Sequence, residues 1–323
     1  MMHRNATNTA RPPSLIDTIG TGFRALNRAL PALLIPLLLD LWYWLGPRIS
    51  IRPLVDWIRS AFDPATWQQL RTQVSPLLTS DRIFDLKFSG QVEGRLPFWD
   101  RVYVLDPGPG VPHPFQAATW NVGGFLTLFG AVIAINLMLT FLTAVYLLPL
   151  ADIIRDGAAP QGWARRVIRA WLSQLAVTGI VLTLLIVIGI PLFTVAGILA
   201  SAAPAFGNLV AIFGMAVLLW IIFTASFAYD AIVVSNAGPI GAMLASLLVI
   251  RKSFWSAVGL YLLNFFILEG LSIIWDGLMG SLPGLIVAMV SSAYVGAGLA
   301  AAHLVFYHDR LPASAARKTG SQS

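Results

Sequence analysis

Long apolar runs, separated by short charged stretches, constrain this chain more than any other feature of its 323 residues. Hydrophobic residues make up 57% of the sequence and charged residues only 11%, and the mean hydropathy is +0.75. Nearly all of the charge lies between the apolar runs. Only segments that satisfy their own backbone hydrogen bonds can cross the hydrocarbon of a bilayer, so this pattern predicts membrane-spanning helices.

The apolar runs approach or exceed the ~20 residues that a helix needs to span a bilayer. They cover residues 29–46, 122–150, 169–199, 205–229, 256–275 and 282–306. We therefore predict an all-α polytopic membrane protein with six transmembrane helices, an N-terminal interfacial amphipathic helix and one external segment of about 70 residues. The expected parts are a cytoplasmic tail with the amphipathic helix (1–28), the first transmembrane helix (29–46), the external segment (47–121), a five-helix membrane bundle (122–306) and a second cytoplasmic tail (307–323).

The distribution of lysine and arginine predicts the orientation. The two terminal tails and segments 151–168 and 230–255 carry these residues, whereas the short loops 200–204 and 276–281 contain none. Positively charged loops stay in the cytoplasm, so both termini are expected inside a bacterial plasma membrane. The net charge of +6 is expected to serve contact with anionic lipid headgroups, and no nucleic-acid partner is predicted.

Residues 14–30 have the apolar spacing of an amphipathic helix. Apolar side chains recur every three or four positions from Ile16 to Leu30, and Arg24 and Arg28 lie outside this stripe. Two interpretations stay open. The helix either lies in the cytoplasmic membrane interface, with its arginines toward the headgroups, or packs on the protein itself.

The predicted external segment, 47–121, mixes two periodicities. Residues 52–62 and 65–78 are amphipathic with helical spacing, whereas residues 82–94 and 100–106 alternate in places and suggest short strands. Because about 70 residues make only a marginal core alone, we expect this segment to pack on the outer face of the membrane.

A short pattern occurs twice within the bundle. Asp152 and Asp230 each follow an apolar run and precede an Ala-x-Pro-x-Gly turn, at 158–162 and 237–241, and a basic stretch with a tryptophan comes next. Repeated hairpins of this kind occur in transporters. A carboxylate is unfavourable at a helix C-terminus, so both aspartates are expected to pair with cations. The candidate partners are Arg155, Arg165 and Arg251.

Three further carboxylates lie in or beside apolar runs. Asp40 lies inside the first run, where an ionisable group indicates a functional site by default, and the alternative is a structural role near the outer interface. Glu269 and Asp276 lie seven residues apart on one helix face at the outer end of the fifth run. Two such groups could work as acid and base or bind a cation, and the alternative is an ordinary wet interface.

Small and polar residues within the spans predict helix packing. Ser292, Gly296 and Ala300 form a stripe at four-residue spacing that lets another helix approach closely, most simply within the chain and alternatively in a homodimer. Asn136, Gln174 and Asn264 are expected to hydrogen-bond between helices. The sequence contains no cysteine and no spacing typical of a zinc, phosphate-loop or dinucleotide site. No catalytic residue, metal or cofactor is therefore predicted.

Two segments resemble known proteins. Residues 25–50, ALNRALPALLIPLLLDLWYWLGPRIS, look like a segment near the start of uncharacterised bacterial six-helix membrane proteins. Residues 238–263, GPIGAMLASLLVIRKSFWSAVGLYLL, are similar to the membrane region of glycerophosphodiester phosphodiesterase-type proteins. The matching positions are Ser246, Arg251, Phe254 and Trp255. The chain has no room for the soluble phosphodiesterase domain, so the resemblance implies a six-helix bacterial membrane protein without that activity.

These observations leave three functional hypotheses. The first is a non-enzymatic scaffold, accessory or lipid-packing protein whose partners are the lipid bilayer and other membrane proteins. The second is a small-molecule or lipid transporter, which the repeated pattern favours. The third is a membrane-embedded hydrolase or transferase, for which Glu269 and Asp276 are the candidate groups.

Overall fold

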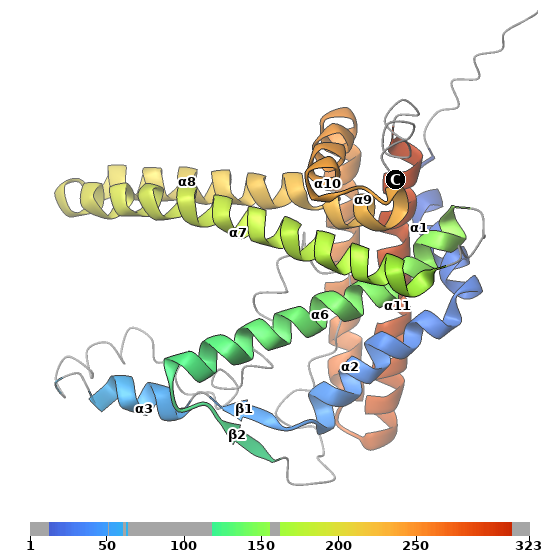
Figure 1. The fold of residues 1–323 in the computed structure, drawn as a ribbon, viewed down its shortest axis with the longest axis horizontal. Coiled ribbons are helices and arrows are strands. Elements are labelled where there is room, and N and C mark those ends of the chain that lie inside the picture. Colours follow the sequence, from blue (N-terminus) through green and yellow to red (C-terminus); the bar gives the residue numbers. More distant parts are fainter. Residues whose placement is uncertain (1–12, 51, 61–62, 64–117, 156–161, 312–323) are drawn as a thin grey trace, which may run out of the picture.

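The computed structural model (Figure 1) describes residues 13–50, 52–60, 63, 118–155 and 162–311. Most of the predicted external segment, including its second helix and both strands, lies outside this part of the chain. In order, the elements are α1 (Leu15–Arg28), the 3₁₀ helix η1 (Leu30–Leu33), α2 (Leu34–Leu45), β1 (Arg48–Ser50), α3 (Arg52–Ser60), β2 (Thr119–Asn121), α6 (Phe125–Ile154), α7 (Trp163–Ala202), α8 (Pro204–Ala225), α9 (Ala228–Ser235), α10 (Pro239–Leu278) and α11 (Leu282–Arg310).

The described chain is an all-α polytopic membrane protein, as predicted. Five of its helical segments are long and apolar enough to cross a membrane, namely α6, α7, α8 together with α9, α10 and α11. A sixth candidate is α1 together with η1 and α2, which bends by 93° at the break after Arg28. Ala29 leaves the helical region at this break, and Pro31 starts η1. The predicted first span, 29–46, is therefore a short 3₁₀ turn followed by α2.

The amphipathic helix α1 packs on the protein itself, which was one of its two predicted positions. It lies against α11, where Gly22 sits so close that an added Cβ would be 2.5 Å from the backbone nitrogen of Ala302. The ring of Phe23 covers Gly298 in the same way. The hydroxyl of Tyr294 on α11 donates to Oδ1 of Asn27 at 3.0 Å. Two glycines, one from each helix, thus allow close packing, since Gly22 meets the backbone of α11 and Gly298 accommodates the ring of Phe23.

The stripe of small residues on α11 is buried within this chain. Ser292 is fully buried and Ala300 is 4% exposed, while Gly296 is also buried. This placement agrees with packing inside one chain.

The segment 230–255, predicted as a cytoplasmic connection, is largely helical. It forms α9 and the first half of α10, and α10 kinks at Ser253, whose φ of −133° is not helical. The chain also breaks between α8 and α9. There, Oγ of Ser246 on α10 accepts from the backbone N–H of Phe227 at 3.0 Å and donates to the carbonyl of Thr224 at 2.6 Å. One buried serine therefore satisfies the backbone groups that the break leaves without a helical partner.

Helices α7 and α8 form a projecting hairpin. The antiparallel helices α7 and α8 lie side by side and extend away from α10 and α11, as the yellow-green arm of Figure 1 shows. Gly207 near the start of α8 touches Ala200 of α7, and an added Cβ would overlap its backbone. Glycine at this position lets the two helices meet directly at the tip of the arm.

The two ends of the predicted external segment are joined to each other. Strands β1 and β2 pair in parallel, with Ile49 opposite Trp120. This pairing, which the sequence pattern did not reveal, brings residues 48–50 beside residues 119–121. Helix α3 confirms the helical pattern predicted for the first part of the segment.

The main core surrounds α9. Every residue of α9 from Ala228 to Val234 is buried, and Phe227, Leu260 and Tyr307 pack around it from the neighbouring elements. A smaller cluster joins α2, α10 and α11 near the turn between the last two helices, and it includes Trp44 and Trp275. Trp44 is therefore a core residue.

Candidate lipid-facing site

A charged junction holds the base of the α7–α8 hairpin. Asp152, in the last turn of α6, accepts from Nη2 of Arg155 at 2.5 Å and from Nη2 of Arg166 on α7 at 2.7 Å. Nη1 of Arg166 also donates to the other carboxylate oxygen at 3.0 Å, which makes a bidentate pair. Nη1 of Arg155 donates to the carbonyl of Val234 at 3.1 Å, near the end of α9. The junction therefore joins α6, α7 and α9.

Asp152 has the structural role expected for it, although only one of its partners was predicted. Arg155 was a candidate, and Arg166 takes the place of its neighbour Arg165. The side chains of Asp152 and Arg166 are 12% and 14% exposed, so this ion pair is largely removed from water. The arginines offset the unfavourable position of a carboxylate at the end of a helix.

Asp230 is not the counterpart of Asp152, which corrects the predicted equivalence. Because the chain breaks after α8, Asp230 falls in the first turn of α9, where the helix dipole favours a negative charge. It is also fully buried. The starts of the following helices differ as well, since Gly162 is the residue preceding α7, with a φ of +93°, whereas Pro239 is already the first residue of α10. The repeated pattern thus corresponds to two different local structures.

The remaining predicted carboxylates do not form a cluster. Asp40 is fully buried on α2, and Leu39 and Tyr43 of the same helix are buried as well. Glu269 and Asp276 on α10 are both exposed, as a wet interface requires.

Polar residues within the spans form few contacts between helices. Nδ2 of Asn264 on α10 lies 2.6 Å from Nε2 of the buried His303 on α11, which confirms an interhelical contact for Asn264. Thr178 on α7 hydrogen-bonds the hydroxyl of Tyr229 on α9 at 2.5 Å. Asn136 instead bonds a carbonyl of its own helix, that of Val132. The amide of Gln174 is fully buried and has no hydrogen-bond partner among the described residues.

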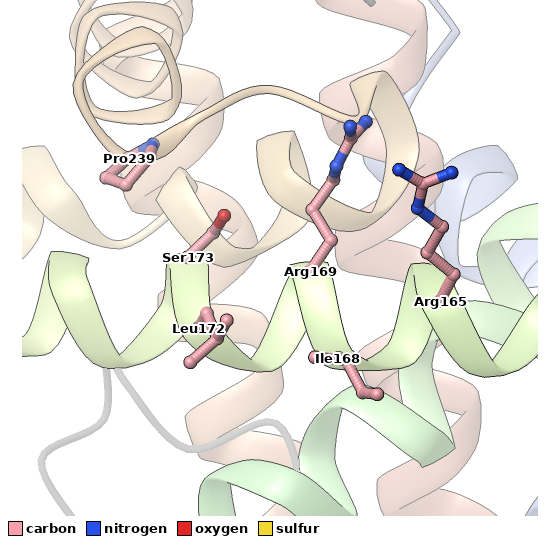
Figure 2. Close-up of a pocket in the computed structure, with 6 residues that line it drawn as sticks. All are labelled: Arg165, Ile168, Arg169, Leu172, Ser173 and Pro239. Carbon is pink, nitrogen blue, oxygen red and sulfur yellow. The ribbon is translucent and has the colours of Figure 1, made fainter.

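A pocket of about 400 Å³ opens beside this junction, along the first turns of α7. Its lining consists of Arg165, Ile168, Arg169, Leu172, Ser173 and Pro239. Figure 2 shows the two arginines and the Ser173 hydroxyl extending to one side of α7, toward α9 and the start of α10. Ile168 and Leu172 extend the other way in this view. The pocket therefore has a cationic side and an apolar side.

Sequence reasoning did not single out this pocket. Arg165 entered only as a candidate partner for an aspartate, and Arg169 was not singled out. The spacing did contain the information, because positions 165, 169 and 173 are each four residues apart and so lie on one helix face. What brings Pro239 to the same place is the packing of α10 on α7, which no local pattern predicts.

Comparison with protein-family models, with curated proteins and with solved structures finds no match to this chain. The resemblance of residues 25–50 and 238–263 to bacterial six-helix membrane proteins therefore stays a prediction.

Proposed function

We propose that the protein is a non-enzymatic integral membrane protein that organises lipid around its α7–α8 hairpin, as a lipid-packing or scaffold component. One observation carries this proposal. Between Arg169 and Asp230 the chain has no Asp, Glu, Lys, Arg or His, and many large apolar side chains of this arm are exposed. Ile186, Phe206 and Ile212 are 56%, 66% and 68% exposed. Such a surface suits acyl chains and offers no group for acid–base chemistry.

The base of the hairpin supports a structural role. Arg166 ties α7 to Asp152, and Arg155 ties α6 to the end of α9, so the arm starts from a fixed point. A rigid apolar arm constrains the lipid chains that pack against it, whereas an arm without such a base would follow their motion.

The transporter hypothesis has lost its main support, because the two aspartates of the repeated pattern lie at opposite ends of their helices. The hydrolase hypothesis rests on Glu269 and Asp276, two exposed side chains on one helix. The lipid-exchange assay distinguishes both hypotheses from the proposed lipid-packing role.

Spin labelling tests the lipid-facing arm. The chain has no cysteine, so Leu209→Cys and Ile212→Cys each place one label on α8. In reconstituted vesicles we expect both labels to be relaxed by oxygen, which dissolves in the hydrocarbon, and shielded from a water-soluble nickel chelate. Arg24→Cys, on an exposed position of α1, is the control and should respond to nickel. Nickel access to both α8 labels equal to that of the control would contradict the proposal.

A flippase assay separates lipid packing from transport. In vesicles that contain a fluorescent phospholipid, the protein is expected to leave the rate of transbilayer exchange at that of protein-free vesicles. The loss of fluorescence after addition of dithionite outside the vesicles measures this rate. Acceleration in proportion to the amount of protein would favour the transporter instead. Release of a labelled headgroup would favour the hydrolase.

The proposed location is the bacterial plasma membrane, with both termini in the cytoplasm. Exposed cations support this orientation, since they gather on α1, the first turns of α7 and the first half of α10. They are Arg24, Arg28, Arg165, Arg169, Arg251 and Lys252. Exposed tryptophans, Trp163 at 48% and Trp255 at 80%, accompany them, as is typical of a membrane interface.

Single cysteines also test this topology. A membrane-impermeant maleimide added to intact cells should modify Gly280→Cys, in the turn between α10 and α11, and should spare Ser323→Cys until the cells are lysed. The reverse pattern would contradict the orientation, and equal labelling of both positions in intact cells would contradict it as well.

A further inference from the structure

Two arginines of the pocket have no ion-pair partner among the residues that the structure describes. Arg165 and Arg169 are exposed, lie one helical turn apart and form no ion pair with any residue that the structure describes. Like charges at this spacing repel each other. Their neighbours Arg155 and Arg166, by contrast, share Asp152. A bound anion between Arg165 and Arg169 would relieve this repulsion.

Ser173 supplies a hydroxyl group to the same place. Its side chain is only 8% exposed, yet it lines the pocket and forms no hydrogen bond within the described part of the chain. Serine within a helix commonly bonds a carbonyl of the preceding turn or points to solvent, and Ser173 does neither. In Figure 2 its oxygen points to the same side of α7 as the two guanidinium groups. A nearly buried polar group aimed into a cationic pocket is a ready hydrogen-bond donor for an anion.

The start of α10 adds to the positive potential. Pro239 lines the pocket as the first residue of this helix, and the preceding Gly238 has no side chain to cap it. The first backbone N–H groups of a helix have no intrahelical acceptor, and the helix dipole places partial positive charge there. Helix starts with this arrangement favour phosphate groups.

The other side of the pocket fits an acyl chain. Ile168 and Leu172 are 51% and 55% exposed, and the apolar surface of the hairpin continues beyond them. The volume of about 400 Å³ lies within the range of small-ligand sites and suits one headgroup. Trp163, at the beginning of α7, is typical of the depth at which headgroups lie.

We propose that this pocket binds the phosphate of an anionic phospholipid, with Arg165, Arg169 and Ser173 on the phosphate and the apolar side along the lipid chain. The inference rests on the proposed lipid-packing function and names its lipid class. A soluble phosphate ester shares the headgroup chemistry but would leave Ile168 and Leu172 without a ligand.

Native mass spectrometry of the full chain in detergent micelles tests the site. We expect phosphatidylglycerol to bind at least ten times more tightly than phosphatidylcholine. The double variant R165Q/R169Q should lose this preference, because it removes both cations. The control, R251Q/K252Q, removes the same charge from exposed positions on α10 about 18 Å along the helix from Pro239, and it should retain the preference. Ser173→Ala is expected to weaken phosphatidylglycerol binding about threefold.

Equal binding of phosphatidylglycerol by the double variant and by its control would overturn the site, and so would equal binding of the two lipids by the unmodified protein. A competition arm distinguishes the two sources of phosphate. Soluble glycerol phosphate should displace phosphatidylglycerol only at concentrations a hundredfold higher, and equal potency would overturn the lipid assignment. The spin-label experiment on α8 is independent of these residues. Lipid-exposed α8 labels together with failed headgroup binding would reject the pocket alone, whereas water-exposed labels would reject the proposed function itself.

Discussion

Replacing Asp152 with alanine should be among the most destabilising single changes in this protein. The substitution leaves Arg155 and Arg166 without their shared carboxylate, and both side chains are less than a quarter exposed. Removal of one partner from a largely buried ion pair costs more than the pair contributes, because the remaining charge is left unpaired. We expect a loss of about 3 kcal/mol in the free energy of unfolding. Thermal unfolding in detergent micelles, followed by circular dichroism, measures this loss.

Asp276→Ala is the matched control for the Asp152 variant. Asp276 also lies near the end of a long helix, but it is exposed and forms no ion pair within the described residues. Both substitutions gain the same helix propensity. The difference between their unfolding free energies therefore measures the contribution of the Asp152 junction. The control should change stability by no more than about 0.5 kcal/mol. Equal shifts in the two variants would show that the junction does not hold the base of the hairpin.

The Asp152 junction also marks where prediction from sequence succeeded in part. The dipole argument predicted that Asp152 needs a cation, and it named Arg155 correctly. It could not choose between Arg165 and Arg166, because the choice depends on how α7 is rotated about its own axis. That rotation is set by packing against α6 and α9, which depends on residues far apart in the sequence.

The break between α8 and α9 could not be predicted from the sequence, for a related reason. The apolar run from residue 205 to 229 reads as one continuous span, and nothing within it resembles a helix stop. The hydrogen bonds that stabilise the break are formed by the hydroxyl of Ser246, which lies on another helix. The position of Asp230 follows from this break, so its role was misread together with the helix boundary. Composition predicted the spanning helices well, since their length and polarity are local properties.

The sequence also could not decide which surface the amphipathic helix α1 packs against. Its apolar stripe suits a lipid surface or a protein surface, because the hydrophobic effect does not distinguish the two. What decides in favour of α11 is close contact at two glycines, because the backbone of Ala302 lies against Gly22 and the ring of Phe23 lies against Gly298. The glycines can be read from the sequence, but their contacts depend on how α1 and α11 pack in the tertiary structure.

Two glycines in α1 provide the second large expected effect, because they differ only in what surrounds them. At Gly22 an added Cβ would lie 2.5 Å from the backbone nitrogen of Ala302, so Gly22→Ala must push α1 away from α11. Overpacking of this kind costs about 1–3 kcal/mol. At Gly20 an added Cβ meets nothing within 4 Å. Gly20→Ala should therefore stabilise α1 by up to about 1 kcal/mol, through helix propensity alone.

Limited trypsin digestion reads the docking of α1 directly, because Arg24 and Arg28 are exposed cleavage positions that a docked helix protects by its backbone structure. Gly22→Ala should be cut there at least several times faster than the unmodified protein, and Gly20→Ala should be cut no faster. Gly298→Ala is expected to act like Gly22→Ala, since its methyl group would enter the ring of Phe23 from the opposite side of the same contact. Identical cleavage rates for the Gly20 and Gly22 variants would mean that α1 is held by its apolar stripe alone, as it would be at a lipid surface, and not by backbone contact with α11.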